Sequence, residues 1–470
     1  MVISLSTQYG LGYAILALVG LLVLSGTFAL VHGRKRFQFV LSNAILIAIA
    51  LMSFYLFYVS TSFTVGYAFL VYPFSMFFVF LFAVSLVLVN MLSYGHSSDF
   101  LAFSMLLGFT AAGMFAVAMA GSLVAIILGI ELVSLPTAFM IMMSGKGYIE
   151  SAVKLFVLAA ISVAMLAFAL ALIFPYDPSL ALVPYSNNSG VGGNYLVVLS
   201  LFLFIAGLAF DASIFPFNLW VPDVYQGAQA NITALLAGVN KKVAFAALFE
   251  VLFILFVPLT AATSSIFQIL AILTMFFGNL AALAQDNVKR LFAYSAISQA
   301  GYIAIGIAAA TQYGIEASLL QIFAHTFMII GTFAIVLVLE SKNIKTIKDY
   351  GGLGERNGLA AFALTIFMLS MIGVPPLLGF VGKFLLFTSA IDNGLIFLTF
   401  VAIVNSLISV YYYARLIASM YSKHGRAPLV LDWTVSSVVG VCVIITIILG
   451  LYPQPTISIA AIASSSLYAI

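Results

Sequence analysis

The sequence predicts an all-α polytopic membrane protein, and three observations support this fold class. Of the 470 residues, 64% are hydrophobic and only 7% are charged, which is too few charges to cover a soluble domain. About fourteen continuously apolar runs are long enough to cross a bilayer, which takes roughly 20 residues in a helix. The connections between the runs are short, so they leave no room for a soluble domain.

These runs give the expected spanning helices in chain order. We expect them near residues 10–31, 37–59, 67–93, 100–120, 122–143, 152–174, 194–216, 231–257, 266–284, 288–310, 315–340, 358–391, 394–421 and 433–452. The first run has no basic segment before it and no small-residue cleavage site after it, so it is expected to remain as a helix.

Basic residues collect on one side of the membrane. If the N-terminus lies outside, the outside loops contain no Lys or Arg, and the inside loops carry Arg34, Lys35, Arg36, Lys146, Lys154, Lys289, Arg290, Lys342, Lys345, Lys348, Arg356, Lys423 and Arg426. Because basic loops stay in the cytoplasm, we expect a multi-pass protein of the cell (plasma) membrane with both termini outside. The outside loop 175–194 contains Asn187-Asn188-Ser189, which fits an N-glycosylation sequon.

Proline and glycine interrupt two runs at depth. The seventh reads FDASIFPFNLWVPD (210–223) and the twelfth reads SMIGVPPLLGFVGKF (370–384). Paired broken helices indicate an internal repeat with an ion site at mid-membrane. The breaks are five spans apart, and five is odd, so we expect two inverted five-helix repeats. The expected division is a three-helix segment (1–99), a first repeat (100–257), a second repeat (266–421) and a C-terminal helix and tail (422–470).

Ionisable side chains inside the apolar runs are the best indication of function. A charge at the bilayer centre costs at least about 2.5–3.5 kcal/mol, so such residues usually face a wet cavity or a partner and mark an ion pathway. Glu131 lies near mid-depth, either as a proton-binding carboxylate or as a neutral acid in the bundle core. Lys241 and Lys242 are about 100° apart on a helix, so they face different neighbours. Snorkelling is the alternative for them, but it fits only near a helix end.

The apolar runs contain further ionisable groups. Lys383 follows the break in the twelfth run, where freed carbonyl groups can hold an ammonium. Asp211 precedes the break in the seventh run and could be a counter-ion for a lysine. His325 is either a satisfied core residue or a proton relay. Glu250, near the outer end of the eighth run, is either functional or interfacial, and Arg415 fits a structural role at an inner helix end.

The chain offers no recognisable site for a redox cofactor. Its single cysteine, Cys442, excludes a disulfide, a Cys-ligated zinc site or an iron–sulfur cluster within this chain alone. No GxGxxG, Walker or His-Glu-x-x-His pattern occurs, so no nucleotide, flavin or haem site is indicated. We therefore expect no cofactor and no metal in this chain.

Several segments together resemble one family. They are IELVSLPTAF (130–139), IESAVKLF (149–156), FPFNLWVPDVYQGAQANITALLAGVNKKVAF (215–245), GNLAALAQDNVKRLFAYSAISQAGY (278–302), IKDYGGLGER (347–356) and LTIFMLSMIGVPPLLGFVGKFLLF (364–387). The chain resembles the antiporter-like membrane subunits of respiratory complex I, most closely the N type (subunit 2 in mitochondria). The WVPDVYQGA form is similar to the N type rather than to the M and L types, and 470 residues leave no room for the lateral helix of the L type.

The resemblance implies fourteen core helices, two inverted five-helix repeats and broken helices 7 and 12. It also implies a mid-membrane chain of charges that moves protons when partner subunits reduce quinone. By motif, Glu131 matches the family's helix-5 glutamate, Lys241 its helix-8 lysine and Lys383 its helix-12 lysine. Partner subunits would carry flavin or iron–sulfur clusters, and quinone would bind elsewhere. The implied partners are neighbouring antiporter-like and small membrane subunits together with lipids, and no nucleic acid.

The sequence departs from the family pattern at three positions. Asp211 stands where the family usually has a lysine, and Asn218 and Gln299 stand where it usually has histidines. The usual Glu–Lys pair of helices 5 and 7 is therefore absent, and two acids there would repel each other. Our hypothesis is that Lys242, the extra lysine, supplies the missing positive charge to Glu131 or Asp211.

Three functions remain to be weighed. The first is a proton-translocating, non-redox subunit of a complex I-like quinone oxidoreductase supplied by NADH, coenzyme F420 or ferredoxin. The second is a subunit of an Mrp-type cation/proton antiporter or a membrane-bound hydrogenase, against which the N-type motif argues. The third is a membrane scaffold with a vestigial charged axis. We expect the first.

Overall fold

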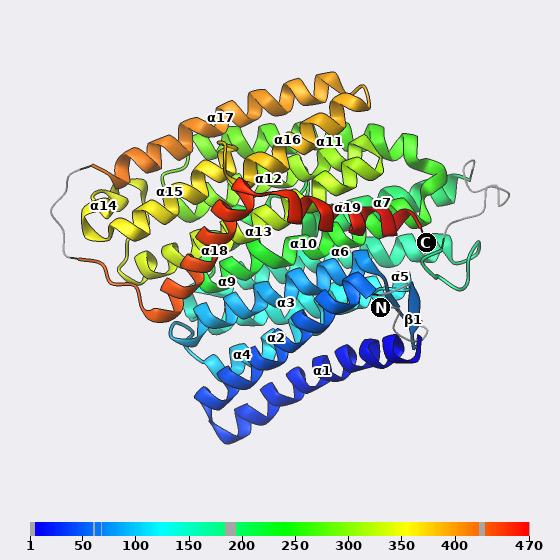
Figure 1. The fold of residues 1–470 in the computed structure, drawn as a ribbon, viewed down its shortest axis with the longest axis horizontal. Helices are drawn as coiled ribbons and strands as arrows, with labels where there is room; N and C mark the ends of the chain where they lie inside the picture. Colours follow the sequence, from blue (N-terminus) through cyan, green and yellow to red (C-terminus); the bar gives the residue numbers. More distant parts are fainter. Residues whose placement is uncertain (1–4, 60–61, 67, 184–193, 423–427, 470) are drawn as a thin grey trace. The chain divides into compact units, whose positions relative to one another are not determined.

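The computed structural model describes residues 5–59, 62–66, 68–183, 194–422 and 428–469, and it is nearly all-helical (Figure 1). In these residues, 12 helices are long and apolar enough to cross a membrane. The expected spans 231–257 and 358–391 are not among them because each is divided into shorter helices. The total of fourteen therefore stays a prediction. The sequon at Asn187 lies outside the described residues.

The chain folds into two compact units that do not follow a single cut of the sequence. Unit 1 consists of Met1–Ala212, Val239–Ala262 and Ala461–Ile470, and unit 2 consists of Ser213–Gly238 and Thr263–Ala460. The expected four-part division by residue number stays a prediction.

Unit 1 is a bundle with a small β-hairpin. Its helices are α1 (Leu5–His32), α2 (Lys35–Val59), α3 (Pro73–Tyr94), α4 (Phe100–Ala118), α5 (Leu123–Met143), α6 (Ile149–Ile173), α7 (Tyr195–Ala212) and α10 (Lys241–Glu250). The hairpin pairs β1 (Phe63–Val65) with β2 (Phe69–Val71) in antiparallel register. Asp99 and Ser122 cap α4 and α5 by accepting backbone N–H groups of the first turn, as residues of these types usually do.

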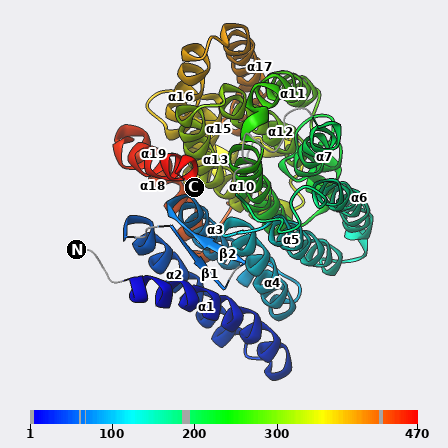
Figure 2. The same cartoon turned by 90° about the vertical axis from the view of Figure 1, so that its right-hand side faces the viewer.

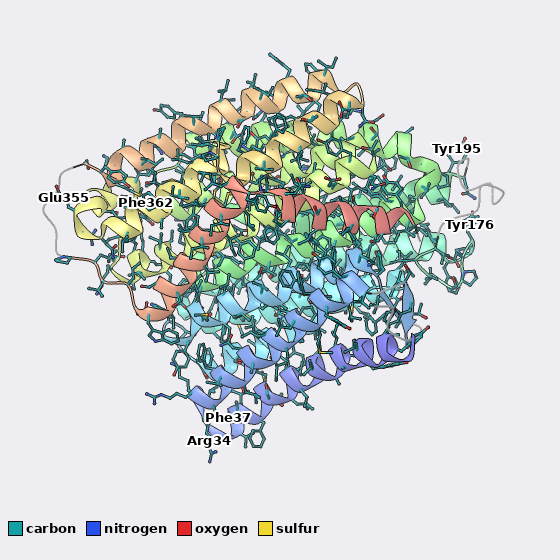
Figure 3. All side chains as sticks on the ribbon, viewed as in Figure 1. Arg34, Phe37, Tyr176, Tyr195, Glu355 and Phe362 are labelled. Carbon is teal, nitrogen blue, oxygen red and sulfur yellow. The ribbon has the colours of Figure 1, made fainter. Side chains whose placement is uncertain are left out.

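Helices that follow one another in unit 1 pack side by side, as α2 does on α3 and α4 on α5. A Cβ at Gly113 of α4 would lie 2.6 Å from the carbonyl oxygen of Gly129, so only glycine allows α4 and α5 to approach this closely. Figure 3 shows Arg34 at one end of this unit and Tyr176 and Tyr195 at the other. The turn between α1 and α2, which carries Arg34, therefore lies at the opposite end of unit 1 from Tyr176 and Tyr195.

Unit 2 is built around two buried helices. Its elements are α8 (Trp220–Gly227), α9 (Ala230–Leu235), most of α11 (Thr260–Leu283), α12 (Val288–Ala309), α13 (Gln312–Ser341), α14 (Leu353–Arg356), α15 (Gly358–Ile372), α16 (Leu378–Asp392), α17 (Ile396–Met420), α18 (Trp433–Leu451) and the start of α19 (Gln454–Tyr468). The most apolar stretches of α12 and α13 are each 94% buried. Helix α13 packs against α9, α12, α15, α16 and α18, and all of these except α9 are labelled near it in Figure 2.

Both expected helix breaks are present. Helix α7 ends at Ala212, and α8 begins at Trp220, beyond Pro216. Helix α15 ends at Ile372, and α16 begins at Leu378. Gly373 follows α15 with φ +98, a left-handed conformation that glycine adopts without strain and that ends many helices.

A buried ion pair closes one end of unit 2. Lys289 was expected in an inside loop, but it is the second residue of α12 and is buried. Its ammonium lies 2.7 Å from Oε1 of Glu340 on α13 and also donates to the carbonyl of Ala228. Glu340 Oε2 accepts the N–H of Ala230 at 2.9 Å. The pair therefore holds the turn between α8 and α9 against α12 and α13.

Candidate functional site

Two carboxylates of unit 1 lie close together. Glu131 is on α5 and half-buried, and Asp211 is the second-last residue of α7. Asp211 is near enough to Glu131 to feel its charge, and the Ser162 hydroxyl lies beside it. Pro136 is inside α5, so the carbonyl of Leu132, next to Glu131, loses its helical partner. Mutual repulsion of the two acids stays a prediction.

The paired lysines follow a distorted helical turn. Lys241 and Lys242 open α10 and are 2% and 1% exposed, which argues against snorkelling. They come directly after a π-helical segment, Leu236–Asn240, and a second one, Val251–Leu255, follows α10. Single π-helical turns are frequent at functional sites. The Asn240 amide donates to the Thr137 hydroxyl at 3.0 Å, which ties the start of α10 to α5.

Helix α10 packs against α4, α5 and α7, so the lysines and the two carboxylates belong to one group of helices in unit 1. The hypothesis that Lys242 compensates Glu131 or Asp211 stays a prediction. Low-dielectric surroundings make each such charge sensitive to the others. This cluster can therefore bind protons and respond to a charge change nearby.

Unit 2 places Lys383 at the break between α15 and α16. Its ammonium donates to the Ile372 carbonyl at 3.0 Å and to the Ser406 hydroxyl at 3.1 Å, and it lies 4.1 Å from the centre of the Tyr302 ring. Lys383 is 3% exposed and forms no ion pair with any described residue. Ile372 ends α15, so its carbonyl is one of those that a helix terminus leaves without a helical partner. The site thus holds a cation with neutral groups.

A chain of side-chain amides links α13 to this break. Gln321, one turn before His325, donates to Gln299 at 2.9 Å, and Gln299 donates to the Met371 carbonyl at 3.0 Å. His325 is 1% exposed, deep in the core of α13. Gln299, which stands where the family usually has histidine, therefore acts here as a hydrogen-bonding bridge next to Ile372. An amide has no ionisable proton, so this bridge fixes geometry rather than storing charge.

The comparisons with known proteins agree with this architecture. Residues 120–409 match the family described as NADH:quinone oxidoreductase/Mrp antiporter, transmembrane. The chain belongs to this family. Among its members, NADH-quinone oxidoreductase subunit N of Trichlorobacter lovleyi is 38% identical over 69% of this chain and 68% of the relative. The F420H2 dehydrogenase subunit N of Methanosarcina mazei is 34% identical over 81% of each chain.

A solved structure of the family has the same fold. A chain of respiratory complex I from Thermus thermophilus superimposes with a TM-score of 0.82 at 28% identity, covering 95% of this chain and 99% of that chain. The resemblance to complex I antiporter-like subunits is therefore confirmed, and so is the all-helical membrane fold.

Sequence reasoning left two features of the site unrecognised. One is the contact of Glu250, which is fully buried and accepts a hydrogen bond from the Tyr72 hydroxyl at 2.9 Å. The π-helical turns around Lys241 have no sequence signal, because no proline marks them. Tyr72 comes directly before the proline that begins α3, and nothing in the sequence around it indicates a hydrogen bond to Glu250, 178 residues away.

Proposed function

We propose that this chain is a proton-translocating, non-redox membrane subunit of a complex I-like quinone oxidoreductase. Family membership and relatives named as subunit N support the complex, and the buried Lys383 site supports proton movement. In this proposal, partner subunits carry the flavin and iron–sulfur clusters and reduce quinone. The electron donor is NADH, reduced coenzyme F420 or ferredoxin.

The observation that carries the proposal is the surroundings of Lys383. A carbonyl, a hydroxyl and an aromatic ring hold the ammonium without a negative charge. Such a site binds a proton through dipoles and a cation–π contact, so the proton can leave without breaking an ion pair. A change of charge elsewhere along the membrane axis would then shift the proton occupancy of Lys383, which couples proton movement to partner chemistry.

The carboxylates and lysines of unit 1 would form a second station. In a low-dielectric interior, two nearby acids that share one proton are more stable than two acids that are both ionised. In this role Glu131 and Asp211 share a proton, while Lys241 and Lys242 exchange protons with their surroundings. His325 would relay protons towards Lys383 within unit 2.

The proposed setting follows from the charge pattern. The chain would lie in the cell membrane with both termini outside, because the expected outside loops contain no Lys or Arg whereas the expected inside loops carry basic residues such as Arg34. Its neighbours would be other antiporter-like subunits, small membrane subunits and lipids. Helices α1 and α6, whose most apolar stretches are only 28% buried, offer surfaces for such contacts.

The test is substitution of Lys383 in the intact complex. Lys383→Met keeps an unbranched side chain but cannot carry a proton. We expect quinone reduction to continue while the number of protons moved per quinone falls, measured with a pH-sensitive dye in proteoliposomes. Unchanged proton movement with full assembly would refute the proposal and would favour a scaffold. Proton movement that requires Na⁺ or K⁺ exchange would favour the antiporter alternative.

A further inference from the structure

Unit 1 contains a buried carboxyl group that the proposed route does not use. Glu250 is the last residue of α10 and is 0% exposed, and Tyr72, which donates to its Oε1 at 2.9 Å, is 0% exposed as well. The other oxygen, Oε2, is also buried and accepts no hydrogen bond from the described residues. A buried polar atom without a partner is costly, so such an atom in a native structure requires an explanation.

Glu250 shares a ridge of α10 with the unexpected lysine. Lys242, Ala246 and Glu250 are spaced four residues apart, and residues at this spacing form one row on a helix. Eight residues of helix separate the two ionisable groups by about 12 Å along the axis. Helical side chains lean towards the N-terminus, so the Glu250 carboxyl leans towards Lys242. Ala246, the residue between them in this row, is buried and carries no polar group that could bind the proton itself.

Tyr72 is fixed from two sides. It comes directly after β2, whose Leu70 donates to the carbonyl of Met119 at 2.7 Å. On its other side, its N–H donates to the Ser75 hydroxyl at 3.0 Å. The Tyr72 hydroxyl is therefore held in position to donate to Oε1 of Glu250. This leaves Oε2 as the oxygen that can take up a proton.

We propose that Glu250 is a proton-accepting residue that takes its proton from Lys242, at the end of unit 1 that carries the β-hairpin. Because about 12 Å of helix separates the two groups, water molecules between them carry the proton. A Lys242 N–H bond breaks and an O–H bond forms on Glu250, so an ammonium and a carboxylate become a neutral amine and a neutral acid, and each intervening water gives up one proton and gains one. No other reactant is consumed. Ionisable groups on the helices packed against α10 are Glu131 on α5 and Asp211 on α7. This inference rests on the proposed function and adds a proton site to it.

The test compares two glutamine substitutions in the intact complex. Glu250→Gln keeps the side-chain length and an oxygen that accepts from Tyr72, but it cannot take up a proton. We expect protons moved per quinone to fall at least twofold while assembly and quinone reduction stay unchanged. Glu150→Gln is the matched control, because the Glu150 side chain is 80% exposed, and it should change nothing. Glu250→Asp, which keeps an acid, should restore part of the loss.

A purely structural role predicts different results. If Glu250→Gln moves protons as well as the unmodified chain does, the inference is overturned. It is also overturned if Glu250→Asp is no better than Glu250→Gln. Lys383→Met is measured in parallel. If proton movement falls in Lys383→Met but not in Glu250→Gln, only this inference is overturned. If proton movement falls in neither variant, the proposed function is overturned as well.

An infrared measurement keeps the inference testable if Glu250→Gln does not assemble. In the unmodified complex, a protonated-carboxyl band should change during turnover, and Tyr72→Phe should shift that band because it removes the hydrogen bond to Oε1. A turnover spectrum without such a band, or with a band that Tyr72→Phe leaves in place, would overturn the inference.

Discussion

The ion pair between Lys289 and Glu340 gives a prediction whose size follows from the structure. The two side chains are 6% and 15% exposed, and their charged atoms are 2.7 Å apart. Glu340→Leu would remove the carboxylate and leave the Lys289 ammonium buried with only the Ala228 carbonyl. Lys289→Met would leave Glu340 with the Ala230 N–H and some contact with water.

The two single substitutions should therefore differ. Removing one partner of a buried pair costs about 3–5 kcal/mol, and Glu340→Leu also leaves the Ala230 N–H unpaired, so it belongs at the upper end. Lys289→Met should cost less, about 1–3 kcal/mol, because the remaining carboxylate keeps a donor. The double variant should cost less than the sum, since no charge is left without its partner.

Cys442 offers a direct measurement of this effect. It is the only cysteine of the chain and is 0% exposed, on α18 against α13, which carries Glu340. Its reaction with a thiol reagent, followed by peptide mass spectrometry as the complex is heated, reports when unit 2 opens. In a unit of this size each kcal/mol moves the midpoint by about 2–4 °C, so Glu340→Leu should lower it by roughly 6–20 °C. A double variant as destabilised as the sum of the singles would refute the reasoning.

Three further predictions follow from single contacts. Tyr302→Leu should lower the number of protons moved per quinone, whereas Tyr302→Phe should keep most of it. The reason is that the aromatic ring beside the Lys383 ammonium supplies about 0.5–2 kcal/mol of cation–π attraction. The two variants are compared with the pH-sensitive dye in proteoliposomes. Asp211→Asn should lower the same ratio without slowing quinone reduction, because the proposed route has Glu131 share a proton with this acid. Burial, and then two nearby carboxylates, raise the pKa of Tyr350 above its ordinary value of 10.0. Below about pH 10 the tyrosine is neutral in both the folded and the unfolded chain. Above about pH 10 it ionises in the unfolded chain but not in the folded one, so the free energy of unfolding falls as the pH rises. Tyr350→Phe should therefore slow inactivation at pH 10.5 relative to pH 8, and equal rates for both proteins would contradict this assignment.

Much of the fold was predictable because lipid imposes simple rules. Apolar runs of sufficient length gave most of the helices, and the prolines at 216 and 375–376 gave both breaks, since proline lacks the N–H that a helix requires. The assignment to two compact units was not predictable. Ser213–Gly238 packs with unit 2 although the chain on both sides of it belongs to unit 1, and nothing in its composition signals this.

The site was predictable residue by residue but not in its contacts. Burial of Lys241, Lys242 and Lys383 follows from their place in apolar runs. The groups that hold Lys383 do not follow, because Tyr302 and Ser406 are ordinary residues of their helices until packing brings them together. Buried hydrogen bonds between residues far apart in sequence depend on packing, which a single sequence does not record.

Three of the ionisable groups in the apolar runs share one structural feature. Lys383 follows the break after Ile372, Asp211 precedes the break at Pro216, and Lys241 follows a π-helical turn. At each place the regular i→i−4 hydrogen bonding stops, so backbone groups without a helical partner can interact with a charge that water cannot reach. A regular helix would satisfy those groups internally and leave the charge without compensation. At Lys383, whose ammonium donates to the Ile372 carbonyl, the irregular turn therefore holds the charged group directly. Substitutions that straighten this turn should weaken proton binding there even where no charged residue is changed.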